Sequence, residues 1–171
     1  MKLNDKLEKE IHEIIQPILD KKSKKSYDYL LDKLNQRYEE TKYPGFIYAI
    51  GLLYEKSILY SDNPKKHYEY YDAAATKNYL PALIKIMELY LYHIYYETTM
   101  NGICLIPSKN YNNIKNDVYG EYLLAKYEMI RCIVMNDEHK YFKNGISLMK
   151  DSANKGNVDA QEFLNQLNLW R

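Results

Sequence analysis

The sequence has little of what most specialised classes of protein require. Cysteine occurs only twice, at Cys104 and Cys132, which is too few for a zinc motif or a disulfide framework. No apolar run approaches the ~20 residues that span a bilayer, and the charged segment 1–6 does not resemble the start of a secretory signal. We therefore expect a cytoplasmic protein, with no membrane contact and with both thiols reduced.

An excess of charge of one sign is also missing. Lys+Arg 24 and Asp+Glu 23 leave a formal net charge of +1. Proteins that bind nucleic acid usually concentrate cations on one surface, because each phosphate contact needs one. The one dense basic run here, residues 21–25, falls between two helical patterns, where we expect a solvated loop. No nucleic-acid partner is expected.

Glycine and proline are sparse, at 6 and 5 residues, and the stretches between them carry helical periodicity. Apolar residues recur at spacings of three and four, as in Leu3, Leu7, Ile11 and Ile14. No alternating pattern of the length of a strand is present. The sequence therefore predicts an all-α protein of about eight helices.

The chain length and the positions of helix-breaking residues predict how these helices are organised. A chain of 171 residues fits one domain. Within residues 1–171 we expect an N-terminal helix pair over 1–42, a helical unit over 43–97, an insert over 98–116, and a second unit with a C-terminal helix over 117–171. The insert is predicted to be an irregular loop, because it contains residues that favour turns: Asn101-Gly102, Pro107 and an asparagine-rich stretch.

Small residues recur with the period of a helix-pair repeat. Ala49, Ala82, Ala125 and Ala160 lie about 33 to 43 residues apart. Small side chains let helix axes approach to about 8–10 Å. We therefore expect close helix contacts at Ala49, Ala75, Ala82, Ala153 and Ala160. Asn78 and Gly156 end the helices before two of these alanines, and Asn78 tolerates the left-handed conformation that such an end needs.

Residues 66–82 and 149–160 resemble the Sel1-like repeat signature, which is a lysine, an aromatic pair, a double alanine, a glycine and then an alanine. Asn78 stands in place of the glycine in the first segment, and Ser152 replaces one alanine in the second. The resemblance to this tetratricopeptide-like family implies a right-handed α-solenoid of antiparallel helix pairs. It also implies a protein-interaction role without a shared catalytic centre.

Tyrosine is abundant, with 20 residues against 3 Phe and 1 Trp. This bias has two open explanations, an AT-rich coding sequence and a protein interface, where tyrosine is favoured. For the interface we propose Glu88, Tyr92, Tyr95, Tyr96 and Tyr111 as protein-binding residues. The alternative for the tyrosines at 92, 95 and 96 is that they pack under the insert or against the N-terminal helices.

Motifs for catalysis are missing. No glycine-rich phosphate loop or dinucleotide fingerprint occurs, and His12-Glu13 lacks the second histidine of a zinc protease. We expect no catalytic residues, no metal and no cofactor, and hence no enzyme.

Three functions remain open. The first is an interaction module whose partner is another protein, such as an immunity protein that neutralises a toxic effector. The second is a self-associating scaffold, for instance a homodimer, because the last helix carries Phe163, Leu164, Leu167, Leu169 and Trp170. The third is an unrecognised hydrolase that pairs His93 with Cys104.

Overall fold

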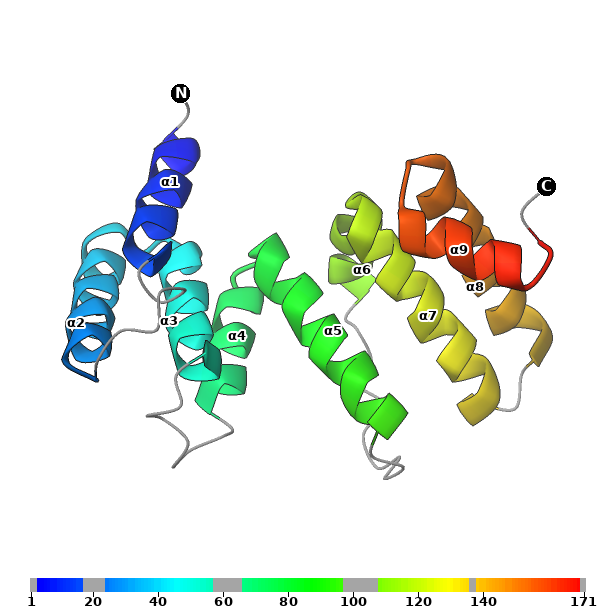
Figure 1. The fold of residues 1–171 in the computed structure, drawn as a ribbon, viewed down its shortest axis with the longest axis horizontal. Coiled ribbons are helices and arrows are strands. Elements are labelled where there is room, and N and C mark those ends of the chain that lie inside the picture. The colour runs from blue at the N-terminus through cyan, green and yellow to red at the C-terminus, as the bar shows by residue number, and fades with distance from the viewer. Residues whose placement is uncertain (1–2, 17–23, 57–65, 97–107, 136–137, 170–171) are drawn as a thin grey trace. The chain divides into compact units, whose positions relative to one another are not determined.

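The structure is a computed structural model that describes residues 3–16, 24–56, 66–96, 108–135 and 138–169 (Figure 1). Within these ranges every regular element is an α-helix, and there are nine of them where we expected about eight. The all-α class is thus confirmed for the described residues. None of these described helices combines the length and apolar character that crossing a membrane requires.

The chain divides into two compact units, residues 1–86 and 87–171. Unit 1 contains the following helices: α1 (Leu3–Ile15), α2 (Lys24–Thr41), α3 (Pro44–Lys56), α4 (Lys66–Ala75) and the first part of α5 (Leu80–Tyr96). Unit 2 contains the rest of α5, followed by α6 (Ser108–Lys115), α7 (Val118–Met135), α8 (Glu138–Asn154) and α9 (Val158–Gln166). The basic run that we expected to form a loop lies partly in a helix, since α2 begins at Lys24.

In unit 1, α3 and α4 pack closely because a glycine faces an aromatic ring. Tyr71 on α4 is fully buried, and a Cβ atom added to Gly51 on α3 would lie 2.6 Å from its ring. The ring of Tyr48 lies 5.4 Å from that of Tyr71. A side chain at residue 51 would therefore force the two helices apart.

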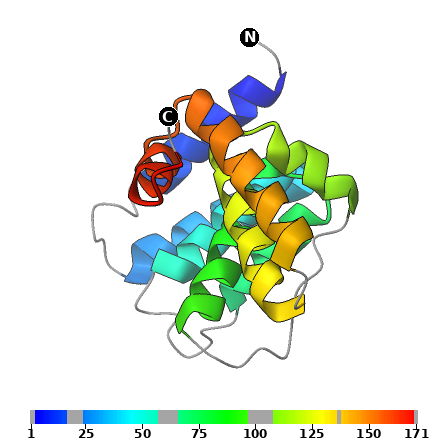
Figure 2. The same cartoon turned by 90° about the vertical axis from the view of Figure 1, so that its right-hand side faces the viewer.

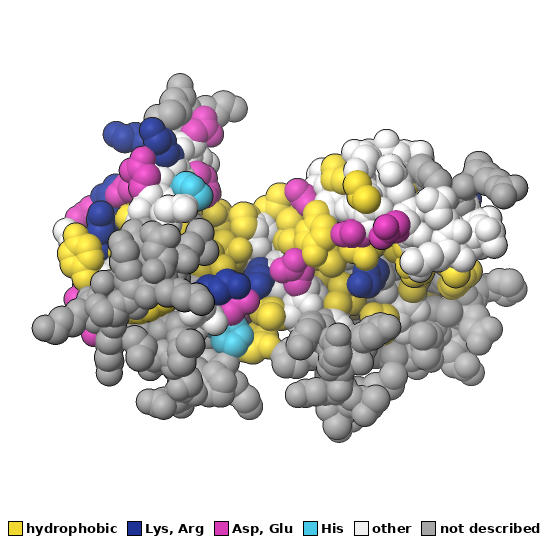
Figure 3. Space-filling model, viewed as in Figure 1, with side chains coloured by type: hydrophobic (Ala, Val, Ile, Leu, Met, Phe, Trp, Pro, Cys, Tyr) yellow, Lys and Arg dark blue, Asp and Glu magenta, His cyan; other side chains and the backbone are white. Residues whose placement is uncertain are grey.

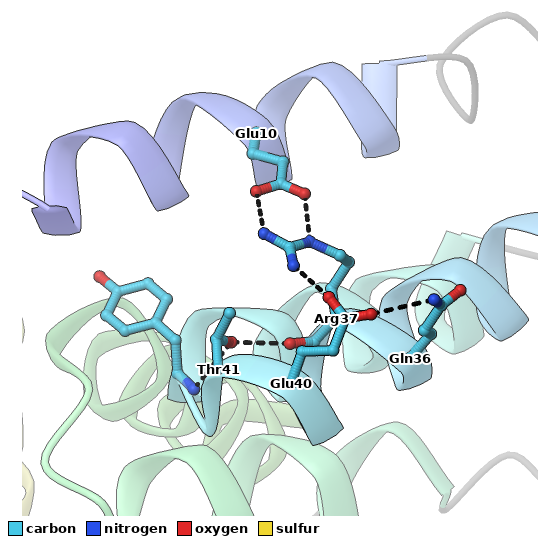
Figure 4. A network of polar contacts seen from close by, with 6 residues as sticks. Glu10, Gln36, Arg37, Glu40 and Thr41 are labelled. Atoms are coloured by element: carbon cyan, nitrogen blue, oxygen red, sulfur yellow. Dashed lines mark hydrogen bonds and ion pairs between the residues drawn. The ribbon is translucent and has the colours of Figure 1, made fainter.

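A polar network joins α1 to α2 (Figure 4). The Arg37 guanidinium binds the Glu10 carboxylate through two nitrogens, one of them Nη2 at 2.7 Å from Oε2, and also binds Glu40. The hydrogen bonds from Arg37 hold the pKa of the Glu10 carboxyl below its usual range. Both side chains are about three-quarters buried, with exposed fractions of 28% and 27%. A bidentate arginine–carboxylate pair of this kind fixes orientation as well as distance.

A second buried carboxylate, Glu55, joins α3, α4 and α5. It accepts a hydrogen bond from the Tyr71 hydroxyl and forms an ion pair with Lys85 Nζ at 2.9 Å. Burial alone would raise the pKa of the Glu55 carboxyl, but the hydrogen bonds from Tyr71 and Lys85 outweigh it and lower the pKa below its usual value.

The lowered pKa values of Glu10 and Glu55 predict that acid destabilises the protein. A carboxyl whose pKa is lower in the folded state stabilises the fold above its unfolded pKa, near 4.5, and loses this contribution as pH falls through the folded pKa. We expect Glu55→Gln to lower the free energy of unfolding by about 1–2 kcal/mol at pH 7 and to weaken its dependence on pH below that value. Urea unfolding at several pH values measures the free energy of unfolding and its dependence on pH. Glu69→Gln, at an exposed residue, is the control. Equal slopes of this free energy against pH for Glu55→Gln and the unmodified chain would contradict the prediction.

The end of α4 has the geometry expected from its asparagine. Asn78 has a φ of 59°, in the left-handed region. Its N–H donates to Ala75 O at 2.8 Å, and the N–H of Tyr79 donates to Ala74 O at 3.3 Å. These two bonds cap the last carbonyls of the helix and reverse the chain into α5. The prediction for Asn78 is confirmed.

The end of α8 repeats this arrangement. Gly156 has a φ of 97°. Its N–H donates to Ala153 O at 3.0 Å, and that of Asn157 donates to Ser152 O at 3.1 Å. The Asn157 side chain then caps α9 by accepting from the N–H of Ala160 at 2.9 Å. The two segments that resemble each other in sequence thus end their helices with the same pair of hydrogen bonds.

The predicted small contact residues are buried. Relative exposure is at most 5% for all of the following alanines: Ala49, Ala75, Ala82, Ala125, Ala153 and Ala160. In unit 2, a Cβ atom added to Gly145 on α8 would lie 2.8 Å from Met129 and 3.0 Å from the carbonyl oxygen of Ala125 on α7. Small residues therefore do mark the close contacts, and Figures 1 and 2 show α7 and α8 side by side.

The expected irregular insert over 98–116 requires a correction, because its second half is the helix α6. The first half of the predicted insert falls in residues 97–107, which lie outside the described residues. The helix forms despite its asparagines because Ile114 packs under the start of α7 and is 1% exposed. Gly120 makes this contact close, since a Cβ atom there would lie 2.4 Å from Ile114 O. Tertiary packing overrides weak helix propensity here.

Candidate protein-binding surface

A stripe of aromatic and cationic side chains runs along one face of α7. Tyr119, Tyr122 and Lys126 are spaced by three and four residues, which places them on the same side of a helix. The rings of Tyr119 and Tyr122 have centroids 6.0 Å apart at an interplanar angle of 32°. Lys126 Nζ lies 5.3 Å from the centroid of the Tyr122 ring. The three side chains thus form one continuous surface.

A carboxylate on α5 fixes the first of these tyrosines. The Tyr119 hydroxyl donates to Glu88 Oε1 at 2.7 Å, while the ring remains 39% exposed. Burial, together with the hydrogen bond to Glu88 and its negative charge, raises the pKa of the Tyr119 phenol. The hydroxyl therefore remains protonated, and the hydrogen bond persists over the physiological pH range. An exposed ring held in this way loses little conformational freedom on binding.

The start of α9 adds negative charge and an apolar side chain. Asp159 and Glu162 are exposed, and Val158 is 67% exposed. Burial raises the pKa of Tyr122, and the negative charge of Asp159 raises it further. Figure 3 shows acidic and hydrophobic side chains adjacent to each other over α7 and α9. We call Glu88, Tyr119, Tyr122, Lys126 and Asp159 the tyrosine face.

The end of α8 holds α7 in this orientation. Ser152 Oγ donates to the carbonyl oxygen of Val118 at 2.8 Å. Lys155 Nζ pairs with Glu121 Oε2 at 2.8 Å, and the Glu121 side chain is only 1% exposed. A buried carboxylate is costly to leave unpaired, so this pair secures the first turn of α7. At the same turn Asp117 Oδ1 accepts from the N–H of Gly120 at 2.8 Å.

The structure separates the residues that the sequence proposed for binding. Glu88 lies on the tyrosine face. Tyr111 lies on α6, where its hydroxyl accepts a long hydrogen bond, 3.5 Å, from Asn144. The proposed tyrosines at 92, 95 and 96 belong to α5, but their side chains lie outside the described residues. Glu88 is thus a residue of α5 and Tyr111 a residue of α6, two different helices.

Sequence reasoning missed Tyr119, Tyr122, Lys126 and Asp159. A signal was present, because the spacing of the first three puts them on one helix face. Tyr127 on the same helix is 3% exposed, so periodicity alone could not say which tyrosines face solvent.

The described residues show no arrangement suited to metal chemistry. No group of three or more His, Cys, Asp or Glu side chains in these ranges could hold a metal ion. The side chains of His93 and Cys104, the pair proposed for a hydrolase, lie outside the described residues.

Comparisons with protein families, with curated proteins and with solved structures find no match for this chain. The surfaces of the two units are therefore the observations that bear on its function.

Proposed function

We propose that the chain is a non-enzymatic protein-interaction module whose tyrosine face binds a partner protein rich in Lys and Arg. The observation that carries this proposal is the hydrogen bond from Tyr119 to Glu88, which holds an exposed aromatic ring in place. Tyrosine contributes a large rigid area at low entropic cost and is enriched among binding hot spots.

The charges of this face define the chemistry of the partner. Within the tyrosine face Glu88 and Asp159 are acidic and Lys126 is cationic, and a further exposed carboxylate, Glu162, follows Asp159 by three residues on α9. An acidic surface attracts a basic one and raises the rate of association at low salt. The exposed ring of Tyr119 adds to this preference, because arginine and lysine bind favourably over aromatic faces.

The repeat resemblance belongs to the same proposal. Sel1-like units stacked into a right-handed α-solenoid of antiparallel pairs would present one helix of each pair on a common binding surface. Support comes from the matching caps at Asn78 and Gly156 and from the buried alanines that follow them, Ala82 and Ala160.

An inhibitory role in the cytoplasm fits such a module. A small protein that covers the active surface of a toxic effector needs a rigid, charged binding face and no chemistry of its own. An immunity protein of this kind would meet an effector whose functional surface is basic, as surfaces that bind nucleic acid are.

Isolation of the tagged chain from the cells that carry its gene tests the proposed function. We expect one protein with a basic surface at a stoichiometric ratio, retained at low salt and released as ionic strength rises, because screening weakens contacts between exposed charges. Glu162→Lys, an exposed change on α9, should weaken retention. Recovery of a monomer without a partner would contradict the proposal.

Self-association is the second candidate. Leu164 is fully buried within unit 2, so the apolar character of α9 is largely used in packing, but Val158, Leu167 and Leu169 are exposed. Light scattering on the purified chain distinguishes the two functions. A dimer at micromolar concentration would favour self-association, and a monomer would favour a different partner.

A further inference from the structure

A cavity opens in unit 2, lined by residues of α6, α7 and α8. Its volume is about 480 Å³. It is lined by Tyr111, Glu128, Arg131, Lys140, Tyr141 and Asn144. Pockets of several hundred Å³ with a few converging polar groups are typical of small-molecule sites.

An arginine is held rigidly in this cavity. The Arg131 guanidinium carbon lies 4.3 Å from the centroid of the Tyr141 ring and 5.6 Å from that of Tyr127. Its Nη2 donates to the Tyr141 hydroxyl at 3.1 Å, whereas the contact of Nη1 with Glu128 is long, at 3.4 Å. Its Nε is buried and has no hydrogen-bond partner in the structure. Buried donors in native proteins are rarely left unpaired, so this arginine is incompletely satisfied.

The remaining lining groups are mainly donors. The hydroxyl oxygens of Tyr111 and Tyr141 accept hydrogen bonds from Asn144 and Arg131, which leaves the proton of each hydroxyl for a ligand. Burial raises the pKa of Tyr111, so its proton is retained at neutral pH. Lys140, whose Nζ lies 5.8 Å from the centroid of the Tyr141 ring, adds an ammonium group.

The charges of the lining select the ligand. Arg131 and Lys140 are cationic and Glu128 is anionic, so the lining carries one excess positive charge. A singly charged anion balances it, whereas the doubly charged form of phosphate does not. Glu128 is only 4% exposed, and its negative charge disfavours a ligand that carries a second negative charge.

We propose that this cavity binds an organic carboxylate, with the carboxylate held by Lys140, Arg131 and the two tyrosine hydroxyls and the apolar body lying against the tyrosine rings. Two kinds of ligand carry such a carboxylate, a free small molecule and a peptide with a free C-terminus. This site is independent of the proposed function, since none of its residues belongs to the tyrosine face.

Titration of the isotope-labelled full chain, followed by NMR, tests the proposal. Phenylpropionate is the probe, and neutral phenylpropionamide and inorganic phosphate are the comparison ligands. We expect saturable shifts of the Arg131 Nε–H signal with the carboxylate and binding at least about tenfold weaker for the amide, because a charge-assisted hydrogen bond is lost. A short peptide with a free C-terminus, compared with its amidated form, distinguishes the two sources.

Two variants locate the binding. Lys140→Gln, an exposed position, should weaken phenylpropionate binding by at least about fivefold, whereas Lys143→Gln on the same helix but outside the cavity should not change it. Equal affinity for acid and amide, tighter binding of phosphate, equal affinity in the Lys140→Gln variant, or no saturation with either carboxylate would each overturn the proposal.

Discussion

Tyr71→Ala is expected to destabilise unit 1 by about 3–5 kcal/mol, the usual cost of truncating a buried aromatic residue. The ring is fully buried against Gly51, and it also contacts the rings of Tyr48 and His67, at centroid distances of 5.4 Å and 5.9 Å. Removing it leaves a cavity where α3 and α4 meet. The helices cannot close that cavity completely, because the remaining packing holds their separation.

The hydroxyl of Tyr71 accounts for part of this effect. Tyr71→Phe keeps the ring and removes the hydrogen bond to Glu55, which should cost about 1.5–3 kcal/mol because the acceptor is charged. Urea unfolding followed by circular dichroism measures both variants. Tyr29→Ala, at a tyrosine that is 64% exposed, is the control and should change stability by less than about 0.5 kcal/mol. A cost below about 1 kcal/mol for Tyr71→Ala would contradict the close packing of α3 on α4.

The all-α class was predictable because its signals are local. The spacing of apolar residues identifies the helices, and the small residues identify where helices meet: Ala49, Ala82, Ala125 and Ala160 are all fully buried. The left-handed conformation of Asn78 could be anticipated from the few residue types that adopt it at low cost. Each of these features depends on a few neighbouring residues.

Helix α6 shows where local signals fail. Its asparagines favour loops when considered alone, and only the burial of Ile114 against α7, beside Gly120, stabilises the helix. That contact joins two elements whose spatial relation the sequence pattern does not reveal.

The residues of the tyrosine face were recognised from the sequence only in part for a related reason. Glu88 was among the residues proposed, but its hydrogen-bond donor, Tyr119, lies on another helix. With 20 tyrosines in the chain, residue type does not distinguish an exposed ring from a core one: Tyr27 is 7% exposed, and Tyr29, two residues later, is 64% exposed. Which tyrosines form a surface depends on how the helices pack.

Tyr119→Ala combined with Tyr122→Ala is expected to weaken partner binding by more than about 30-fold, since central aromatic hot spots each contribute about 2 kcal/mol or more. The two rings form the aromatic part of the tyrosine face, where Tyr119 is exposed and Tyr122 is half-buried, and their centroids are 6.0 Å apart. Removing both eliminates the apolar contact and leaves Glu88 without the Tyr119 hydroxyl. The acidic residues remain, so weak, salt-sensitive association should persist.

Calorimetric titration of the isolated partner into the unmodified chain, the double variant and Tyr29→Ala tests the tyrosine face most directly. Circular dichroism first establishes that each variant is folded, and Glu162→Lys, at an exposed position on α9, serves as an independent variant. We expect the double variant to lose affinity by the stated factor, Glu162→Lys to lose less, and Tyr29→Ala to bind like the unmodified chain. Unchanged affinity in the folded double variant, with affinity lost in Tyr29→Ala instead, would contradict the assignment of this surface.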